Sequence, residues 1–272
     1  MNSSNTILGG FLMEFFDSHS HYNDEKFDLD REEIINKTID EGVTKFICAG
    51  YDVSSSKFSF EIASKYPFIY SICGISPNDV PESKDEIESL VNEIENIIKN
   101  DTSKRVVAVG EIGLDYYWNK DNKEIQKLVF QKQIELANKY NLPIVIHTRE
   151  AVQDTIQMLK ENSVIKKGIF HCCPLNRELV REALKLDFYI SFAGPITFKN
   201  SKNAEEVVNM VPLDKILIET DSPYLAPEPK RGRRNDSRNV KLVAQKIADF
   251  KQIELEQVAK ATYENAMRIF EI

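Results

Sequence analysis

The sequence lacks the features of a membrane, secreted or strongly basic protein. No apolar run approaches the roughly 20 residues that a membrane-spanning helix needs, and no basic segment precedes the short apolar stretch near the N-terminus, as a secretory signal would require. The 272 residues carry a net charge of −8, which argues against sequence-independent coating of nucleic acid and leaves room for a local basic patch. We therefore expect a cytoplasmic protein without membrane contacts. We also expect a monomer, a choice that the residues themselves do not determine.

Linkers and sequence repeats are also missing. No Pro-, Gly- or Ser-rich segment divides the chain, so we expect a single domain over residues 14–272, preceded by an N-terminal extension of residues 1–13. The four cysteines lie in or beside apolar runs. Without an export signal, we expect them to be reduced thiols in the core.

Short apolar runs alternate with amphipathic stretches along the whole chain. Most of these runs are continuously apolar, which is typical of parallel strands that are buried on both faces. The expected strands are 14–20, 44–49, 68–73, 105–109, 143–147, 168–172, 187–191 and 215–220. Eight strand–helix units predict an α/β fold of the (β/α)8 TIM-barrel type. A doubly wound open sheet is the alternative, but the clustering of polar residues at strand ends favours the barrel.

Histidine is scarce, and each histidine lies at or near the end of an expected strand. The chain has four histidines, and the first two are one residue apart, so that on a strand their imidazoles point to the same face. The carboxyl ends of barrel strands face one shared cavity, where active sites lie. We expect six metal-ligating side chains to converge there: His19, His21, Glu111, His147, His171 and Asp221.

These ligand types indicate metal-assisted hydrolysis. Four imidazoles and two carboxylates are too many for one tetrahedral ion, but they suit two divalent ions that share a carboxylate. Glu111, from the middle of the chain, is the expected bridge. A water activated by the two ions would be the nucleophile, and Asp221 would accept its proton as general base. Phosphate esters are the preferred substrates, and the residues do not choose between Mg, Mn and Zn.

Two further segments bear on the substrate. Arg231, Arg233 and Arg234 form a basic loop after the last expected strand, where they could bind phosphate oxygens or only be solvated. Residues 114–118 bring three aromatic side chains, including the only Trp, to the loop after Glu111. They could stack on nucleobases or form a packed lid. Arg149, two residues after a candidate ligand, is a further candidate for substrate binding.

Four motifs resemble the TatD family of metal-dependent deoxyribonucleases. They are Asp17–His21, Gly110–Tyr116, Pro143–Arg149 and Glu219–Pro227, together with the basic segment 231–235. The resemblance covers residues 14–270 and implies an amidohydrolase-like TIM barrel. It also implies that the six residues above are the metal ligands, with Glu111 shared by two ions. The implied activity is a DNase that uses Mg, Mn or Zn and trims single-stranded DNA or DNA ends as a 3′-5′ exonuclease. The choice of DNA comes from the resemblance alone.

One position departs from the family pattern. Where the family carries Gly-x-His-Pro, this chain has Gly74-Ile75-Ser76-Pro77. A serine can donate a hydrogen bond, but it cannot carry a positive charge or bind a metal comparably. We expect Ser76 to lie near the substrate phosphate, with consequences for substrate range and rate.

Two other functions are compatible with these residues. The first is a barrel hydrolase that cleaves a C–N or C–O bond, and the second is a catalytically weak barrel that binds nucleic acid or protein. The basic loop, and a glutamate where amidohydrolase relatives often carry a modified lysine, favour a nuclease over the first. The weak binding barrel is suggested by Ser76, but the complete set of metal ligands favours a nuclease over it.

Overall fold

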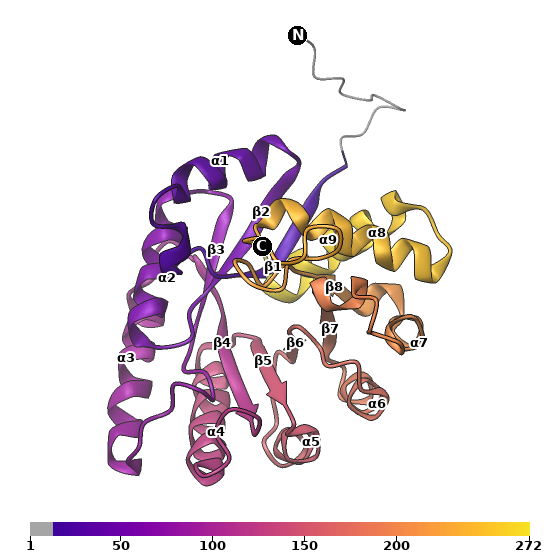
Figure 1. Cartoon of the computed structure of the whole chain (residues 1–272). Helices are drawn as coiled ribbons and strands as arrows, with labels where there is room; N and C mark the ends of the chain where they lie inside the picture. The colour runs from indigo at the N-terminus through magenta and orange to yellow at the C-terminus, as the bar shows by residue number, and fades with distance from the viewer. Residues whose placement is uncertain (1–12) are drawn as a thin grey trace.

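The eight strands of the computed structural model form one parallel sheet in the sequential order β1 to β8. The structure describes residues 13–272, so the expected extension lies outside the described residues except for its last residue. In Figure 1 the strands surround the centre and the helices lie outside them, which confirms the predicted (β/α)8 barrel. The strands are β1 (Phe15–Ser20), β2 (Val43–Ala49), β3 (Ile69–Cys73), β4 (Val106–Asp115), β5 (Ile144–Arg149), β6 (Gly168–Phe170), β7 (Tyr189–Phe192) and β8 (Ile216–Ile218).

Helices follow the strands and pack on the outside of the sheet. None of the described helices is long and apolar enough to cross a membrane. Local capping fixes where several of them begin; the Asp52 side chain, for example, accepts a hydrogen bond from the Ser55 amide at the start of α2. The helices are α1 (Arg31–Asp40), α2 (Val53–Lys65), α3 (Ile87–Asn100), α4 (Lys123–Tyr140), α5 (Val152–Glu161), α6 (Arg177–Lys185), α7 (Ala204–Met210), α8 (Val240–Lys251) and α9 (Leu255–Phe270).

The last helix covers the amino ends of the strands. Residues from several strands form one apolar cluster with the C-terminal residues of α9. Phe16 at the start of β1 stacks on Phe270, with ring centroids 6.1 Å apart. Burial of this apolar surface stabilises the closed end, and the polar site lies at the opposite, carboxyl ends of the strands.

The barrel closes where β1 meets the segment after β8. The buried carboxylate of Asp17 accepts hydrogen bonds from Thr220, at 2.9 Å from its amide nitrogen and 2.5 Å from its hydroxyl. Two residues after Asp17 and one residue after Thr220, the Asp221 amide donates to the His19 carbonyl at 2.9 Å. The first strand and the segment after the last strand are thus joined at His19 and Asp221, two of the candidate ligands.

β4 is longer than the sequence predicts. The expected strand ends at residue 109, yet β4 continues to Asp115, through two glycines, a residue type that weakens strand interiors. Gly113 has a φ of +138°, and a Cβ there would lie 2.0 Å from the His147 carbonyl oxygen. A glycine is therefore needed for β4 and β5 to remain paired. As a result, Glu111 is held inside a strand rather than on a loop.

Candidate metal centre

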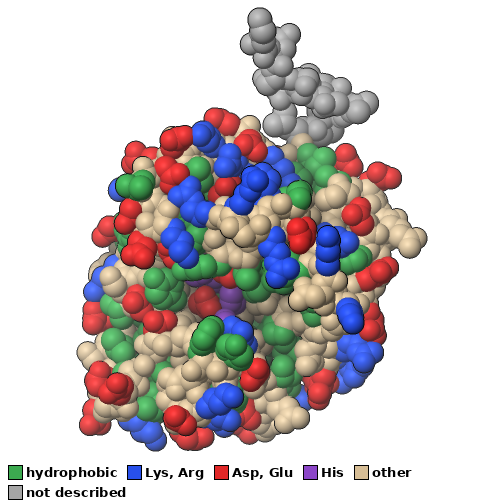
Figure 2. Space-filling view, in the orientation of Figure 1, with side chains coloured by type: hydrophobic (Ala, Val, Ile, Leu, Met, Phe, Trp, Pro, Cys, Tyr) green, Lys and Arg blue, Asp and Glu red, His purple; other side chains and the backbone are tan. Residues whose placement is uncertain are grey.

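The six expected ligands converge at the carboxyl ends of the strands. Their ligand atoms form three overlapping groups, each within 4.8 Å: His19, His21 and Glu111; His19, His171 and Asp221; and Glu111, His147 and His171. Figure 2 shows histidine and acidic side chains at the base of a hollow in the middle of the visible face. The structure therefore brings together residues that lie up to 202 positions apart (221 − 19).

Glu111 lies between two pairs of histidines. Its Oε2 is 3.4 Å from His19 Nε2 and 3.9 Å from His21 Nε2. Its Oε1 is 2.9 Å from His147 Nδ1 and 3.3 Å from His171 Nε2. Within each pair the facing ring nitrogens are 3.3 Å apart. Each oxygen of one carboxylate thus faces its own pair of nitrogens, which is the arrangement that a bridging ligand requires.

Outward hydrogen bonds fix which ring nitrogen of three histidines carries the proton. The acceptors are oxygens that can only accept: Ala49 O for His21 Nδ1 at 3.0 Å, Glu219 Oε1 for His171 Nδ1 at 3.3 Å, and Asp115 Oδ2 for His147 Nε2 at 2.9 Å. In the neutral imidazoles, the other nitrogen then turns a lone pair toward Glu111. Lone pairs and carboxylate oxygens at these distances repel one another unless a proton or a metal ion lies between them, and nitrogen and carboxylate donors of this kind fit divalent metal ions.

Electrostatics at the centre also favour bound cations. Burial opposes the charge of Glu111, but the surrounding histidines outweigh burial and hold its pKa well below the usual range. Burial alone would lower the pKa of His171, yet the carboxylates of Glu111 and Glu219 raise it well above normal. Burial also opposes the charge of Asp115, whose pKa nevertheless falls to about 2, chiefly through its hydrogen bond with His147. Glu111 and Asp115 are thus ionised at neutral pH.

Asp221 faces the same hollow from the turn after β8. Its Oδ1 lies 3.2 Å from His21 Nε2 and 3.9 Å from His19 Nε2. The backbone of Asp221 is left-handed, with a φ of 53°, and its amide is bonded to the His19 carbonyl. This backbone conformation, uncommon for a residue other than glycine, directs the carboxylate toward the histidines. Asp221 is therefore placed to bind a cation or to accept a proton.

The three arginines of the basic loop, which are candidates for binding phosphate, differ in their contacts. Arg234 donates to Asp30 at 2.9 and 2.6 Å, so its guanidinium is already committed to a carboxylate. Arg231 lies over the ring of Phe198 at 4.3 Å. Arg233 is exposed, and no carboxylate of the described residues pairs with it. Arg231 and Arg233 therefore keep charges that no described carboxylate pairs, and Arg233 has no ring contact either.

Ser76 and Arg149 occupy other parts of the rim. The hydroxyl of Ser76 donates to Asp79 Oδ2 at 2.5 Å and accepts from the Asn78 amide at 3.2 Å, and the residue is buried. Arg149 is exposed and stacks over the ring of Tyr117. Ser76 is thus fully hydrogen-bonded within its own loop, while the guanidinium of Arg149 remains open to solvent.

Two residues that support the candidate ligands were not predicted from the sequence. Asp115 orients His147, and Glu219 accepts hydrogen bonds from His171 and, at 2.7 Å, from the Cys172 amide. Both lie within the motifs described above. Their spacing could have identified them, because Asp115 is four residues after Glu111 and Glu219 is two residues before Asp221, and residues at an even spacing on an extended segment share a face.

Comparison with known proteins agrees with this geometry. A family model described as TatD related DNase matches residues 16–271. The uncharacterized metal-dependent hydrolase YabD of Bacillus subtilis is 43% identical over 258 residues, which cover 94% of this chain and 99% of that protein. An uncharacterized metal-dependent hydrolase of Buchnera aphidicola is 36% identical over 96% of this chain and 97% of its own length. The crystal structure of YJJV, a TatD homolog from Escherichia coli, has a TM-score of 0.89 at 23% identity over 96% of this chain and 99% of that one, and shows the same barrel fold.

Proposed function

This chain belongs to the TatD related DNase family, and we propose that it is a metal-dependent hydrolase that cleaves phosphodiester bonds of DNA. The observation that carries the proposal is the position of Glu111, with one oxygen toward the His19–His21 pair and the other toward the His147–His171 pair. Two divalent ions held by these groups, Mg, Mn or Zn, would supply Lewis acidity toward a phosphate and make a water nucleophilic near neutral pH.

The protein's own groups have distinct tasks in this proposal. Glu111 keeps the two histidine pairs at a fixed separation, because it is held within β4 and touches both pairs. Asp221 accepts the proton of the attacking water, since its carboxylate faces the hollow beside His21. Asp115 and Glu219 keep His147 and His171 in the tautomers that face the centre.

The location of the site favours a strand end as substrate. The ligands lie at the base of a hollow (Figure 2), where a flexible single strand reaches more easily than the interior of a duplex. We therefore propose single-stranded DNA or DNA ends as the substrate. The 3′-5′ exonuclease direction rests on the family resemblance, and free Arg233 and Arg149 are proposed to contact phosphates.

Hydrolysis of an end-labelled single-stranded oligonucleotide tests the proposal. Metal-stripped protein receives Mg, Mn or Zn, and His19→Ala serves as the matched ligand variant. We expect metal-dependent shortening that is lost in His19→Ala, and the product ladder gives the direction. Bound metal without cleavage would overturn DNA as the substrate, and esters and amides would be assayed next. Absence of bound metal would overturn the metal-dependent mechanism itself.

A further inference from the structure

Two exposed aromatic side chains stand side by side at the rim of the candidate metal centre. Trp118 is 69% exposed and Tyr117 is 44% exposed, and they are two of only five large hydrophobic side chains exposed in the described part of the chain. Their rings meet edge to face with centroids 4.8 Å apart. The sequence left open a packed lid or a stacking surface, and this exposure favours the stacking surface.

A cation completes this group. The Arg149 guanidinium lies 3.8 Å from the centre of the Tyr117 ring and 5.4 Å from that of Trp118. Arg149 is exposed, and no carboxylate among residues 13–272 forms an ion pair with it. The two rings are nearly perpendicular, so a base would stack on one of them, and the more exposed Trp118 offers that face. An exposed aromatic face with an unpaired guanidinium beside it matches a nucleotide, which offers an aromatic face and an anionic phosphate. We refer to Tyr117, Trp118 and Arg149 as the rim platform.

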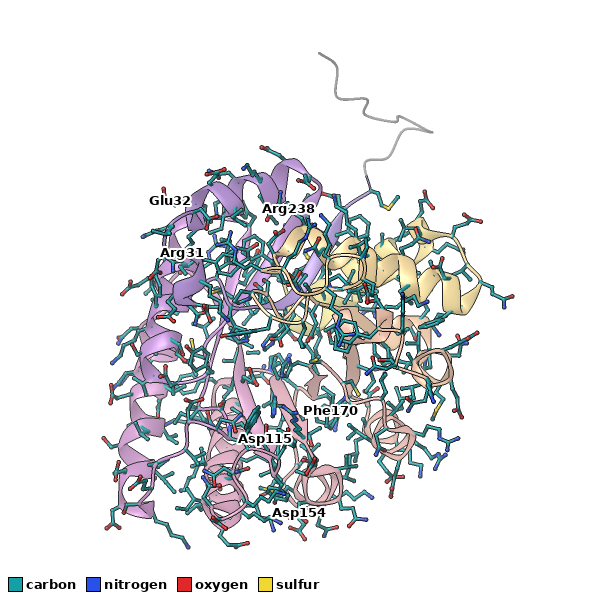
Figure 3. All side chains as sticks on the ribbon, in the orientation of Figure 1. Arg31, Glu32, Asp115, Asp154, Phe170 and Arg238 are labelled. Carbon is teal, nitrogen blue, oxygen red and sulfur yellow. The ribbon has the colours of Figure 1, made fainter. Side chains whose placement is uncertain are left out.

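The rim platform is attached rigidly to the metal centre. Asp115 Oδ1 accepts the amide protons of Tyr117 at 2.9 Å and Trp118 at 3.1 Å, while its Oδ2 accepts from His147. On β5, two residues beyond His147, the backbone of Arg149 lies opposite that of Asp115 in the strand register. The backbone under the exposed rings is therefore fixed by the same carboxylate that orients a candidate ligand, although the rings themselves remain open to solvent. Figure 3 labels Asp115, which ends β4 at this rim.

We propose that the rim platform is a subsite that stacks one unpaired nucleobase of the substrate next to the phosphate being hydrolysed. The inference rests on the proposed function and deepens it, because stacking requires a base that has left the duplex. In a chain of net charge −8, general phosphate attraction is weak, so stacking would supply much of the affinity. The platform would thus select single strands or frayed ends without reading the base sequence.

The fluorescence of the only tryptophan reports on this subsite directly. Full-length, metal-loaded protein is titrated with a hydrolysis-resistant phosphorothioate oligothymidylate. An abasic phosphorothioate strand with the same number of phosphates is titrated in parallel. We expect saturable quenching of Trp118 by oligothymidylate and little by the abasic strand. Equal responses to the two strands would overturn the inference, because the phosphates alone would then account for binding.

Variants test the same subsite by anisotropy of a dye-labelled oligothymidylate. Trp118→Leu should weaken binding roughly tenfold through the loss of one base stack, while Trp118→Phe, which keeps an aromatic face, should recover most of it. The matched control is Ile165→Ala, which truncates another exposed hydrophobic residue, in the connection before β6 at the amino ends of the strands. An equal loss in Trp118→Phe and Trp118→Leu, or no loss in either, would overturn the inference.

The two proposals can fail separately. Cleavage of ordinary DNA without base-dependent quenching would leave the proposed function standing and reject the rim platform. Base-dependent quenching without cleavage under any metal would keep the platform as a nucleobase site and reject the hydrolysis of DNA. The absence of both would reject both.

Discussion

Nε2 of His147 lies 2.9 Å from Oδ2 of Asp115, so this imidazole is held from the side opposite to Glu111. The bond leaves Nδ1 of His147 to face the centre. Partners of this kind set the tautomer and basicity of a metal-binding histidine. Asp115 is therefore a positioning residue for the metal centre, even though none of the three ligand groups includes it.

Asp115→Asn should weaken metal binding about 10- to 100-fold, because the amide removes the charge that favours the His147 tautomer. Metal titration against a chromophoric chelator measures the change. The matched control is Asp154→Asn, on the neighbouring α5, where the carboxylate accepts from the Tyr116 hydroxyl at 2.7 Å and touches no histidine. Both residues are labelled in Figure 3. Equal losses in the two variants would show that Asp115 has only a structural role.

Glu111→Ala should lower the metal content and reduce hydrolysis to below about 1% of the wild-type rate, since a direct ligand matters more than the 10- to 100-fold typical of its supporting partners. Elemental analysis and the oligonucleotide assay measure the two effects. Full activity after metal is added back would contradict a shared carboxylate. Circular dichroism of the variant checks that β4 still folds.

Arg233→Ala should raise the KM for DNA severalfold without changing the melting temperature, because its guanidinium is free to bind phosphate. Arg234→Ala should instead lower the free energy of unfolding by up to about 1 kcal/mol, because its charge is committed to Asp30. Asp30→Asn should reproduce the second effect. If Arg234→Ala changed only the KM, the Asp30 pair would be incidental to stability.

Ser76→His should lower the KM for DNA roughly tenfold, because an imidazole adds a donor that can carry charge toward a phosphate, and a hydrogen bond to a charged group contributes about 1.5–3 kcal/mol. Steady-state kinetics on the oligonucleotide measure it, with thermal melting to exclude misfolding at this buried position. Ser76→Ala is the control and should bring no gain. An unchanged KM in Ser76→His would make the serine a neutral departure.

The sequence predicts most of this fold, for reasons that particular residues make clear. Buried parallel strands are continuously apolar, so runs such as Pro143–Ile146 can be recognised as strands from the sequence. Candidate ligands can then be recognised as polar residues at the ends of such runs. The extension of β4 was not predictable, because Gly113 signals a break unless the close approach of His147 is known. Nor was the pairing of Arg234 with Asp30, which depends on two loops meeting and follows no pattern in the chain.

The seam between β1 and β8 has a consequence for the order of events during synthesis. His19 emerges from the ribosome early and Asp221 late, and both are placed by the hydrogen bonds that join their segments. A nascent chain that lacks β8 carries most of the ligands, and β1 can pair with β2, but Asp17 and His19 lack their hydrogen-bond partners Thr220 and Asp221. We therefore expect hydrolase activity to begin only after the last strand and the segment that follows it have been added, so that an incomplete chain would have no activity toward nearby molecules.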